Sequence, residues 1–260
     1  MERLYDLLRR IIGVLLLLPP FALAFFAGGI YFKFAVFLAL LILYYEIYHI
    51  ISNRFNPYAF LFGIFTISIS FWKGEVIISL LFLSIFGVIN YIMGFSAKEA
   101  LTILAVVVFI LIPATVLVDI REVSLKLAFF VLFTNWMFDT GAYLSGKFLG
   151  RRRIFTNISP GKTLEGLIGG ILTSTVVGGI VGYFLWDPNK VLGFSLTGFY
   201  IGVLAQVGDL LESALKREKG LKDSGKIMPG HGGLFDRVDS LLLSLTGFYL
   251  IFRIFREFYL

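Results

Sequence analysis

The sequence contains no cysteine and only two histidines among its 260 residues. The absence of cysteine excludes disulfide bonds, zinc–thiolate sites and a thiol nucleophile. Charged residues are also scarce, at 15%, whereas hydrophobic residues reach 58%. Ordinary soluble domains carry roughly 25% charged residues, and disordered chains are far less apolar than this one. The composition therefore excludes both classes and indicates an integral membrane protein.

Nine apolar runs are separated by charged residues or by breaks that contain proline or glycine. They cover residues 10–31, 34–52, 58–72, 75–93, 99–119, 125–145, 163–186, 191–212 and 238–256. A membrane-spanning helix takes about 20 apolar residues, so the third run is short and would also suit a re-entrant segment. Residues Glu2 to Arg10 indicate a short interfacial helix. We expect an all-α integral membrane protein with about nine transmembrane helices.

Lysine and arginine residues are distributed unevenly over the two sides that nine spans define. With the N-terminus in the cytoplasm, 16 of them lie on the cytoplasmic side and 7 on the other. Cytoplasmic loops carry the excess of these residues in membrane proteins, which favours this orientation. The two longest polar connections, 146–162 and 213–237, are then both cytoplasmic.

Small residues recur every four positions along the seventh run. These residues are Gly166, Gly170, Ser174, Gly178 and Gly182. Such a ridge lets another backbone approach closely. Tight packing within the monomer is one interpretation, and a homodimer interface is the alternative.

The most informative acidic residues lie within or at the ends of the later apolar runs. Asp139 lies in the sixth run, Asp209 and Glu212 near the end of the eighth, and Asp236 and Asp239 at the start of the ninth. A bare carboxylate at membrane depth costs roughly 2.5–3.5 kcal/mol. These groups are therefore expected to face a partner, a cavity or a cation.

Three of these carboxylates are expected to lie close together on the cytoplasmic side of the membrane. Asp236 and Asp239 are three residues apart, which places them on one helix face, and Asp209 ends the preceding run on the same side. Close carboxylates repel unless a cation or a proton lies between them. A hard cation, most simply Mg²⁺, is one interpretation. Ion pairing without a metal, for example of Asp236 with Arg237 or Lys216, is the other.

The connection 213–237 combines basic residues with glycines. Five lysines or arginines from Lys216 to Lys226 precede the turn Pro229-Gly230-His231-Gly232-Gly233. Glycines let backbone N–H groups approach an anion, and lysines neutralise phosphates. Beside a cation site, this loop would suit a nucleoside triphosphate. Positive-inside bias and lipid contact would explain the basic residues alone, but not the glycines.

The other connection ends in Ser159-Pro160-Gly161-Lys162-Thr163, which opens the seventh helix. Lys162 and Thr163 fall at the helix N-terminus, a natural anion site. Glu165 would cap the helix or pair with Lys162. The spacing of a Walker A loop is missing.

The segment from Ser213 to Asp239 resembles the signature of the phosphatidate cytidylyltransferases, also called CDP-diacylglycerol synthases. The matching positions are Ser213-x-Leu215-Lys216-Arg217, Lys222-Asp223-x-Gly225 and Pro229-x-His231-Gly232-Gly233-Leu234-x-Asp236-Arg237-Val238-Asp239. Two further segments, Asp139-Thr140-x-Ala142-Tyr143 and Ser159-Pro160-x-Lys162-Thr163-x-Glu165-Gly166, also resemble family elements. The resemblance covers about 135–245, whereas the first 130 residues match only as a hydrophobic pattern.

The resemblance implies a membrane enzyme that converts phosphatidate and CTP into CDP-diacylglycerol and pyrophosphate with Mg²⁺. It divides the chain into 1–130, with about five weakly specified helices, and 131–260, the catalytic region with both cytoplasmic loops. The metal ligands would be Asp209, Asp236 and Asp239. The three or four carboxylates of the site could also hold a second cation. The expected phosphate-binding residues are Lys162, Lys216, Arg217 and Lys222.

The remaining roles are less direct. Asp223 would orient Lys222 or bind a cation, and His231 would donate to phosphate or to the leaving pyrophosphate. Arg237 would contact the lipid phosphate or the triphosphate. Asp139, Ser159 and Thr163 are further expected substrate-binding residues, and Asp139 would line the cavity from the sixth run. The expected partners are CTP, phosphatidate and the bilayer, with no nucleic acid, and the expected location is a bacterial inner membrane with the site facing the cytoplasm.

Two other functions remain open. A CTP-dependent kinase acting on a polyprenol or phytol would transfer the γ-phosphoryl group and release CDP. A cation-coupled transporter also places carboxylates in its spans, although there they lie at the midplane. A CDP-alcohol phosphotransferase is excluded because its aspartate spacing is missing.

Overall fold

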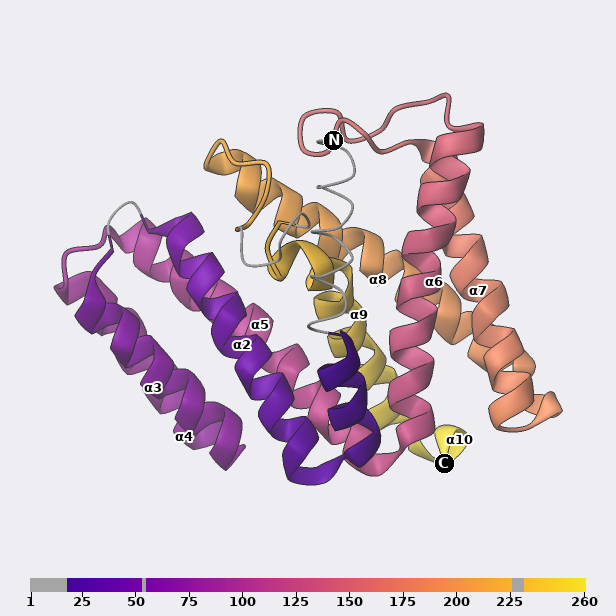
Figure 1. Cartoon of the computed structure of the whole chain (residues 1–260), viewed down its shortest axis with the longest axis horizontal. Coiled ribbons are helices and arrows are strands. Elements are labelled where there is room, and N and C mark those ends of the chain that lie inside the picture. The colour runs from indigo at the N-terminus through magenta and orange to yellow at the C-terminus, as the bar shows by residue number, and fades with distance from the viewer. Residues whose placement is uncertain (1–17, 53–54, 226–231) are drawn as a thin grey trace. The chain divides into compact units, whose positions relative to one another are not determined.

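The computed structural model describes residues 18–52, 55–225 and 232–260 (Figure 1). In these ranges the regular elements are helices, and an isolated antiparallel β-bridge pairs Arg153 with Thr163. A helix at Leu18–Ala27 precedes α2. The following elements are α2 Gly29–Ile51, α3 Pro57–Lys73, α4 Val76–Ile92, α5 Ala97–Val123, α6 Leu125–Leu149, α7 Leu164–Leu185, η1 Pro188–Lys190, α8 Val191–Glu218, α9 Phe235–Ile254 and α10 Arg256–Tyr259. The all-α class is confirmed for the described residues.

Within the part of the chain that the structure describes, four helical segments are long and apolar enough to cross a membrane: α2, α5, α7 and the continuous stretch Pro188–Glu218. The helices α3 and α4 have 17 residues each, which is short for a span that takes about 20. These findings support an integral membrane protein. The number of nine spans and the cytoplasmic side of the two loops stay predictions.

The break between the first two helices lies a few residues earlier in the chain than the sequence predicted. The break falls at Gly28 and Gly29, whose φ angles are 69° and 50°, and not between residues 31 and 34. The predicted boundary was wrong because it followed Lys33, whereas a left-handed backbone is what interrupts the helix here, and glycine adopts it readily. The predicted interfacial helix from Glu2 to Arg10 lies outside the described residues.

The chain divides into two compact units. One comprises Met1–Val118 and Lys219–Arg237, and the other comprises Asp119–Glu218 and Val238–Leu260. The segment 219–237, which carries most of the family signature, therefore groups with the N-terminal helices. The functional division near residue 130 stays a prediction.

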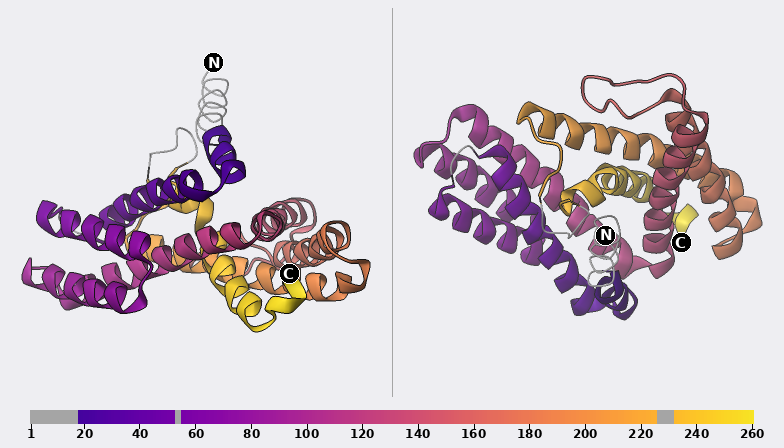
Figure 2. Two further views of the ribbon diagram at one scale, coloured as in Figure 1. Left: turned by 90° about the horizontal axis from the view of Figure 1, so that it is seen from below. Right: turned by 45° about the horizontal axis from the view of Figure 1, so that its top comes forward.

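In the first unit, α3 and α4 form a helical hairpin that packs beside α2 (Figures 1 and 2). Asn56 caps α3 by accepting hydrogen bonds from the N–H groups of Tyr58 and Ala59. The core contains stacked aromatic rings, with the centroids of Tyr44 and Phe60 5.1 Å apart. This packing fixes the C-terminal half of α2.

In the second unit, α7 packs against both α6 and α8. The predicted ridge of small residues is buried along α7. A Cβ atom on Gly166 would lie 3.0 Å from the carbonyl oxygen of Ala142, and one on Gly178 would lie 2.6 Å from that of Phe194. The interpretation of the ridge as packing within the monomer is therefore confirmed. Homodimerisation stays a prediction, and this ridge offers no free surface for it.

Candidate active site

A pocket of about 390 Å³ opens in the second unit between α6, the connection 150–163, the start of α7 and α8. Four of the residues predicted from the sequence line it: Asp139, Lys162, Thr163 and Asp209. They come from three segments that are distant in the chain. The structure thus brings part of the predicted site together in one cavity.

The connection 150–163 folds back on itself and presents Lys162 to the pocket. The N–H of Lys162 donates to the carbonyl of Ser159 at 3.1 Å, which closes the turn over Pro160 and Gly161. The N–H of Ile154 donates to the carbonyl of Lys162 at 3.0 Å. Ser159 thus contributes to the site through its backbone, by shaping this turn.

The start of α7 is held by two side chains. The hydroxyl oxygen of Thr163 accepts a hydrogen bond from the N–H of Gly166 at 3.1 Å and so caps the helix. The carboxylate of Glu165 accepts from the N–H groups of Arg151 and Arg152, at 3.0 and 3.2 Å. The carboxylate also accepts from its own N–H in the first turn of α7, which agrees with the predicted capping role. The alternative pairing with Lys162 was wrong, because Lys162 pairs with Asp209 instead.

Lys162 forms an ion pair with Asp209 of α8. The two side chains are only 20% and 26% exposed. The hydroxyl of Ser213 also donates to Asp209, at 3.4 Å. Ion pairing is thus realised within the pocket, but with different partners from the Asp236 pairs that the sequence suggested.

Polar side chains on α6 and α9 form a ladder that the sequence analysis missed. The hydroxyl of Ser240 donates to Asp139 at 3.1 Å and accepts from the amide of Asn135 at 2.9 Å. The hydroxyl of Ser244 donates to the amide oxygen of Asn135 at 2.7 Å. The four-residue spacings 135/139 and 240/244 place each pair on one helix face, a signal that was available in the sequence. This ladder fixes Asp139.

Asp239 belongs to the same part of the second unit. Its carboxylate accepts from the N–H of Ser240 at 2.8 Å, and the negative charges of Asp209 and Asp139 both act on it. Like charges that share a site are stabilised when a cation joins them. The location therefore suits a positively charged ligand.

Gln206 is a further residue that sequence reasoning missed. It lines the pocket from α8 and is only 6% exposed. Among the described residues its amide nitrogen has no hydrogen-bond partner. A buried donor without a partner costs about 1–3 kcal/mol, so it is well placed to bind a substrate oxygen.

Two predicted phosphate-binding residues at the end of α8 are engaged with the protein. The ammonium of Lys216 lies 2.7 Å from the carboxylate of Glu212, four residues earlier on the same helix. The Nε of Arg217 donates to the carbonyl of Ile158 at 3.3 Å. Arg217 therefore ties α8 to the connection that carries Lys162, and its role toward phosphate stays a prediction.

The other predicted residues lie in the first unit. Lys222 and Asp223 are exposed in a bend, and Arg237 is exposed at the start of α9. Asp236 accepts hydrogen bonds from the N–H groups of Ser224 and Gly233, both at 2.9 Å. The N–H of Gly233 therefore serves a carboxylate of the protein itself. His231 lies outside the described residues.

The predicted Mg²⁺ site has the right donor chemistry, because carboxylate oxygens are the ligands this cation prefers. In the described ranges, however, no three acidic or histidine side chains gather closely enough to hold a metal. Asp209 is neutralised by the ammonium of Lys162. Metal binding by Asp209, Asp236 and Asp239 stays a prediction.

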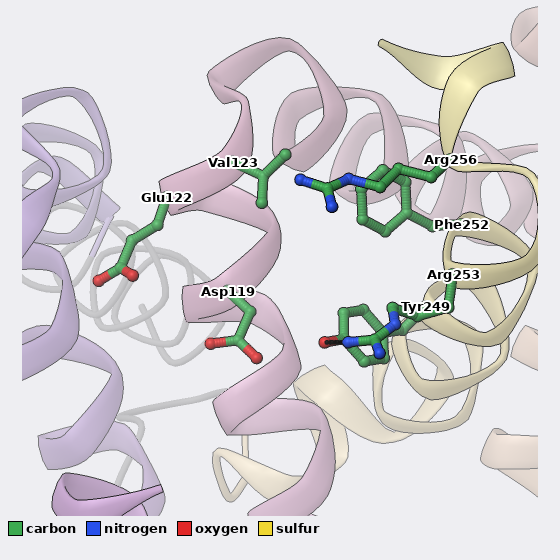
Figure 3. A pocket seen from close by; sticks show the side chains of 7 residues that line it. All are labelled: Asp119, Glu122, Val123, Tyr249, Phe252, Arg253 and Arg256. Carbon is green, nitrogen blue, oxygen red and sulfur yellow. Dashed lines mark hydrogen bonds between the residues drawn. The ribbon is translucent and has the colours of Figure 1, made fainter.

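A second cavity, of about 580 Å³, lies in the second unit between the end of α5 and the end of α9 (Figure 3). It carries two acids, Asp119 and Glu122, and two arginines, Arg253 and Arg256. The guanidinium of Arg253 lies 5.8 Å from the ring centroid of Tyr249. The two acids and two arginines of this cavity balance in charge, and none of the site residues predicted from the sequence lines it.

The sequence of this chain was compared with protein-family profiles and with curated proteins. The profile of the cytidylyltransferase family matches residues 8–255. The phosphatidate cytidylyltransferase of Bacillus subtilis (strain 168) is 39% identical over 137 residues, which cover 53% of this chain and 51% of the relative. That of Staphylococcus aureus (strain COL) is 39% identical over 155 residues, 58% of either chain.

A third relative, uncharacterized protein YnbB of Escherichia coli (strain K12), is 45% identical over 127 residues, which cover 49% of this chain and 42% of the relative. This chain thus spans about half the length of the curated relatives that it matches. The family profile, by contrast, extends over nearly the whole chain, including the pocket and the signature segment. The chain belongs to the cytidylyltransferase family.

Proposed function

We propose that the protein transfers the cytidylyl group of CTP to phosphatidate and forms CDP-diacylglycerol and pyrophosphate. The observation that carries this proposal is the family membership of the chain, together with a pocket that holds Asp139, Lys162 and Asp209. Two relatives named phosphatidate cytidylyltransferase support the choice of the lipid acceptor.

The proposed step is a direct in-line displacement. A phosphate oxygen of phosphatidate attacks the α-phosphorus of CTP, the bond between that phosphorus and the β-phosphate oxygen breaks, and pyrophosphate leaves. The nucleophile is already an anion near neutral pH, so the reaction needs no general base. The protein contributes by positioning the two phosphates and by neutralising their charge.

Lys162 is the residue best placed for this work, because it lines the pocket as a half-buried cation. It would hold a phosphate while Asp209 fixes its position. In the proposal, Lys216, Arg217, Lys222 and Arg237 supply further positive charge. The buried amide of Gln206 donates to a substrate oxygen in the pocket.

Bound Mg²⁺ would neutralise the triphosphate and would be held by Asp209, Asp236 and Asp239. The support for this is chemical: the charges of Asp139 and Asp209 act on Asp239, and a cation relieves such repulsion. The apolar helices would place the site at a bilayer, in a bacterial inner membrane and facing the cytoplasm, where CTP is available.

The experiment that tests the proposal is product analysis with the purified full chain, phosphatidate, Mg²⁺ and CTP labelled at the α-phosphate. Label in the lipid phase together with free pyrophosphate is the expected result. Label in aqueous CDP, with phosphorylation of an added polyprenol, would replace the proposal by a lipid kinase. Absence of turnover with either acceptor would contradict both and favour a transporter. The Asp239→Asn variant serves as the matched inactive control.

A further inference from the structure

Glu46 is a carboxylate buried in a helix that is otherwise apolar. It is the one Asp, Glu, Lys or Arg residue between Lys33 and Arg54, and it lies on α2, one of the helices long enough to span a membrane. Its side chain is only 2% exposed. Ionisable residues in such helices are costly and usually functional, so the contacts of Glu46 need an explanation.

Both carboxylate oxygens of Glu46 are used by the signature segment, within the first unit. Oε1 accepts from the N–H of Leu234 and Oε2 from the N–H of Phe235, each at 2.9 Å. The hydroxyl of Ser224 also donates to Oε2, at 3.4 Å. The first N–H groups of a helix have no partner within that helix, and a negative charge there is favourable. Glu46 therefore binds the start of α9 from a helix 188 positions earlier in the chain.

Two glycines of the signature make room for this carboxylate. A Cβ atom on Gly225 would lie 2.9 Å from Oε1 of Glu46. A Cβ atom on Gly233 would lie 2.6 Å from Oε2. Side-chain carbons essentially never come that close to an oxygen, so any larger residue would push Glu46 away. The two glycines thus leave space for an anion, and in this structure the anion is the carboxylate of Glu46.

We propose that Glu46 is a positioning residue for cytidylyl transfer, which ties the start of α9 and Ser224 to α2; this inference rests on the proposed function. Glu46 touches neither substrate nor metal. It acts through α9, whose first turns carry Asp236 and Asp239. A displacement of about 1 Å in a reacting group can cost roughly 10²-fold in rate. The N-terminal helices would in this way contribute to the chemistry.

The test replaces Glu46 by glutamine, which keeps the size of the side chain but turns one acceptor oxygen into a donor facing an N–H group. Amide hydrogen exchange and steady-state kinetics are measured on the full chain in lipid nanodiscs. We expect exchange in residues 232–237 to become at least about tenfold faster. The kcat is expected to fall about 10- to 100-fold, with the KM for phosphatidate within twofold of that of the unchanged protein. Thr66→Val is the matched control, because Thr66 is buried on α3 and its hydroxyl has no partner among the described residues; it should leave both measurements unchanged.

The proposal is overturned if Glu46→Gln leaves exchange in 232–237 unchanged, if exchange rises equally in α3 and α4, or if kcat stays the same although the segment loosens. Should Glu46→Gln fail to fold, Ser224→Ala removes a single donor to Oε2 and should loosen 232–237 to a smaller extent, with a smaller loss of kcat; no change in either would overturn the proposal. If the unchanged protein transfers no cytidylyl group, the proposed function fails. The exchange measurement still decides whether Glu46 holds α9.

Discussion

The ammonium group of Lys162 pairs with the carboxylate of Asp209 although 47 positions separate them in the chain. The pair joins the turn before α7 to the middle of α8, and it lines the pocket together with Asp139 and Gln206. A half-buried pair is screened less by solvent than an exposed one. Lys162 therefore keeps a fixed position at which it can receive a phosphate.

Replacing Lys162 by methionine should lower kcat/KM for CTP by about 10²–10³-fold, because a positioned cation that stabilises charge in the transition state is lost. The variant should still fold, since methionine retains most of the apolar stem of lysine. Lys73→Met, an exposed change at the end of α3, is the control and should keep full activity. A Lys162→Met enzyme with more than a third of the original kcat/KM would contradict the role of Lys162.

Replacing Asp239 by asparagine should reduce turnover to far below a tenth, because a ligand that stabilises charge typically contributes about 10²–10³-fold. The protein should remain folded and extractable in detergent. Turnover is measured over a range of Mg²⁺ concentrations, with Glu257→Gln, at an exposed position of α10, as the charge-matched control. If the variant retained more than a tenth of the rate, Asp239 would not be a metal ligand.

Gln206→Leu distinguishes a role of Gln206 in substrate binding from a role in stability. Removing a buried amide donor that has no partner among the described residues should leave the thermal unfolding temperature unchanged or raise it, since no hydrogen bond within the protein is lost. The KM for one of the substrates should rise about tenfold, which corresponds to about 1.4 kcal/mol. An unchanged KM combined with a lower unfolding temperature would instead show that Gln206 serves only the packing of α8.

Gly178→Ala tests the role of the small-residue ridge. The new Cβ atom would lie 2.6 Å from the carbonyl oxygen of Phe194 and 3.0 Å from Cα of Gly198. Overpacking of this kind costs about 1–3 kcal/mol, so the unfolding temperature should fall. Ile180→Ala, at an exposed position on the same helix, is the control. Mass measurement in detergent completes the test: a change of oligomeric state without loss of stability would assign the ridge to a homodimer.

The helices and the family could be predicted from the sequence to a large extent. Apolar runs bounded by charges located α3 to α9 within a few residues, because helix formation in a membrane chain depends on local composition. The split at Gly28 was missed, since the apolar run continues through it and only the backbone angle shows the break. The sequence predicts that Lys162, Thr163, Asp139 and Asp209 belong to one site, and all four line the pocket; their roles toward substrate stay predictions.

The missed residues were those whose role depends on burial and on the tertiary surroundings. Asn135 and Gln206 look like ordinary polar residues in the sequence, and only their burial and their contacts distinguish them. Glu46 was overlooked because its run matches the family only as a hydrophobic pattern. A lone carboxylate in an apolar run was nevertheless a usable signal.

The sequence by itself determined the helical membrane class and the family, because both follow from composition and from residues spaced closely along the chain. The tertiary structure decided which partner each charged group has: Lys162 binds Asp209, and Glu46 binds the start of α9. It also decided that the N–H of Gly233 in the signature donates to the carboxylate of Asp236. A buried charge is stabilised by whichever donor the packing brings within hydrogen-bonding distance, and that proximity arises between segments far apart in the sequence.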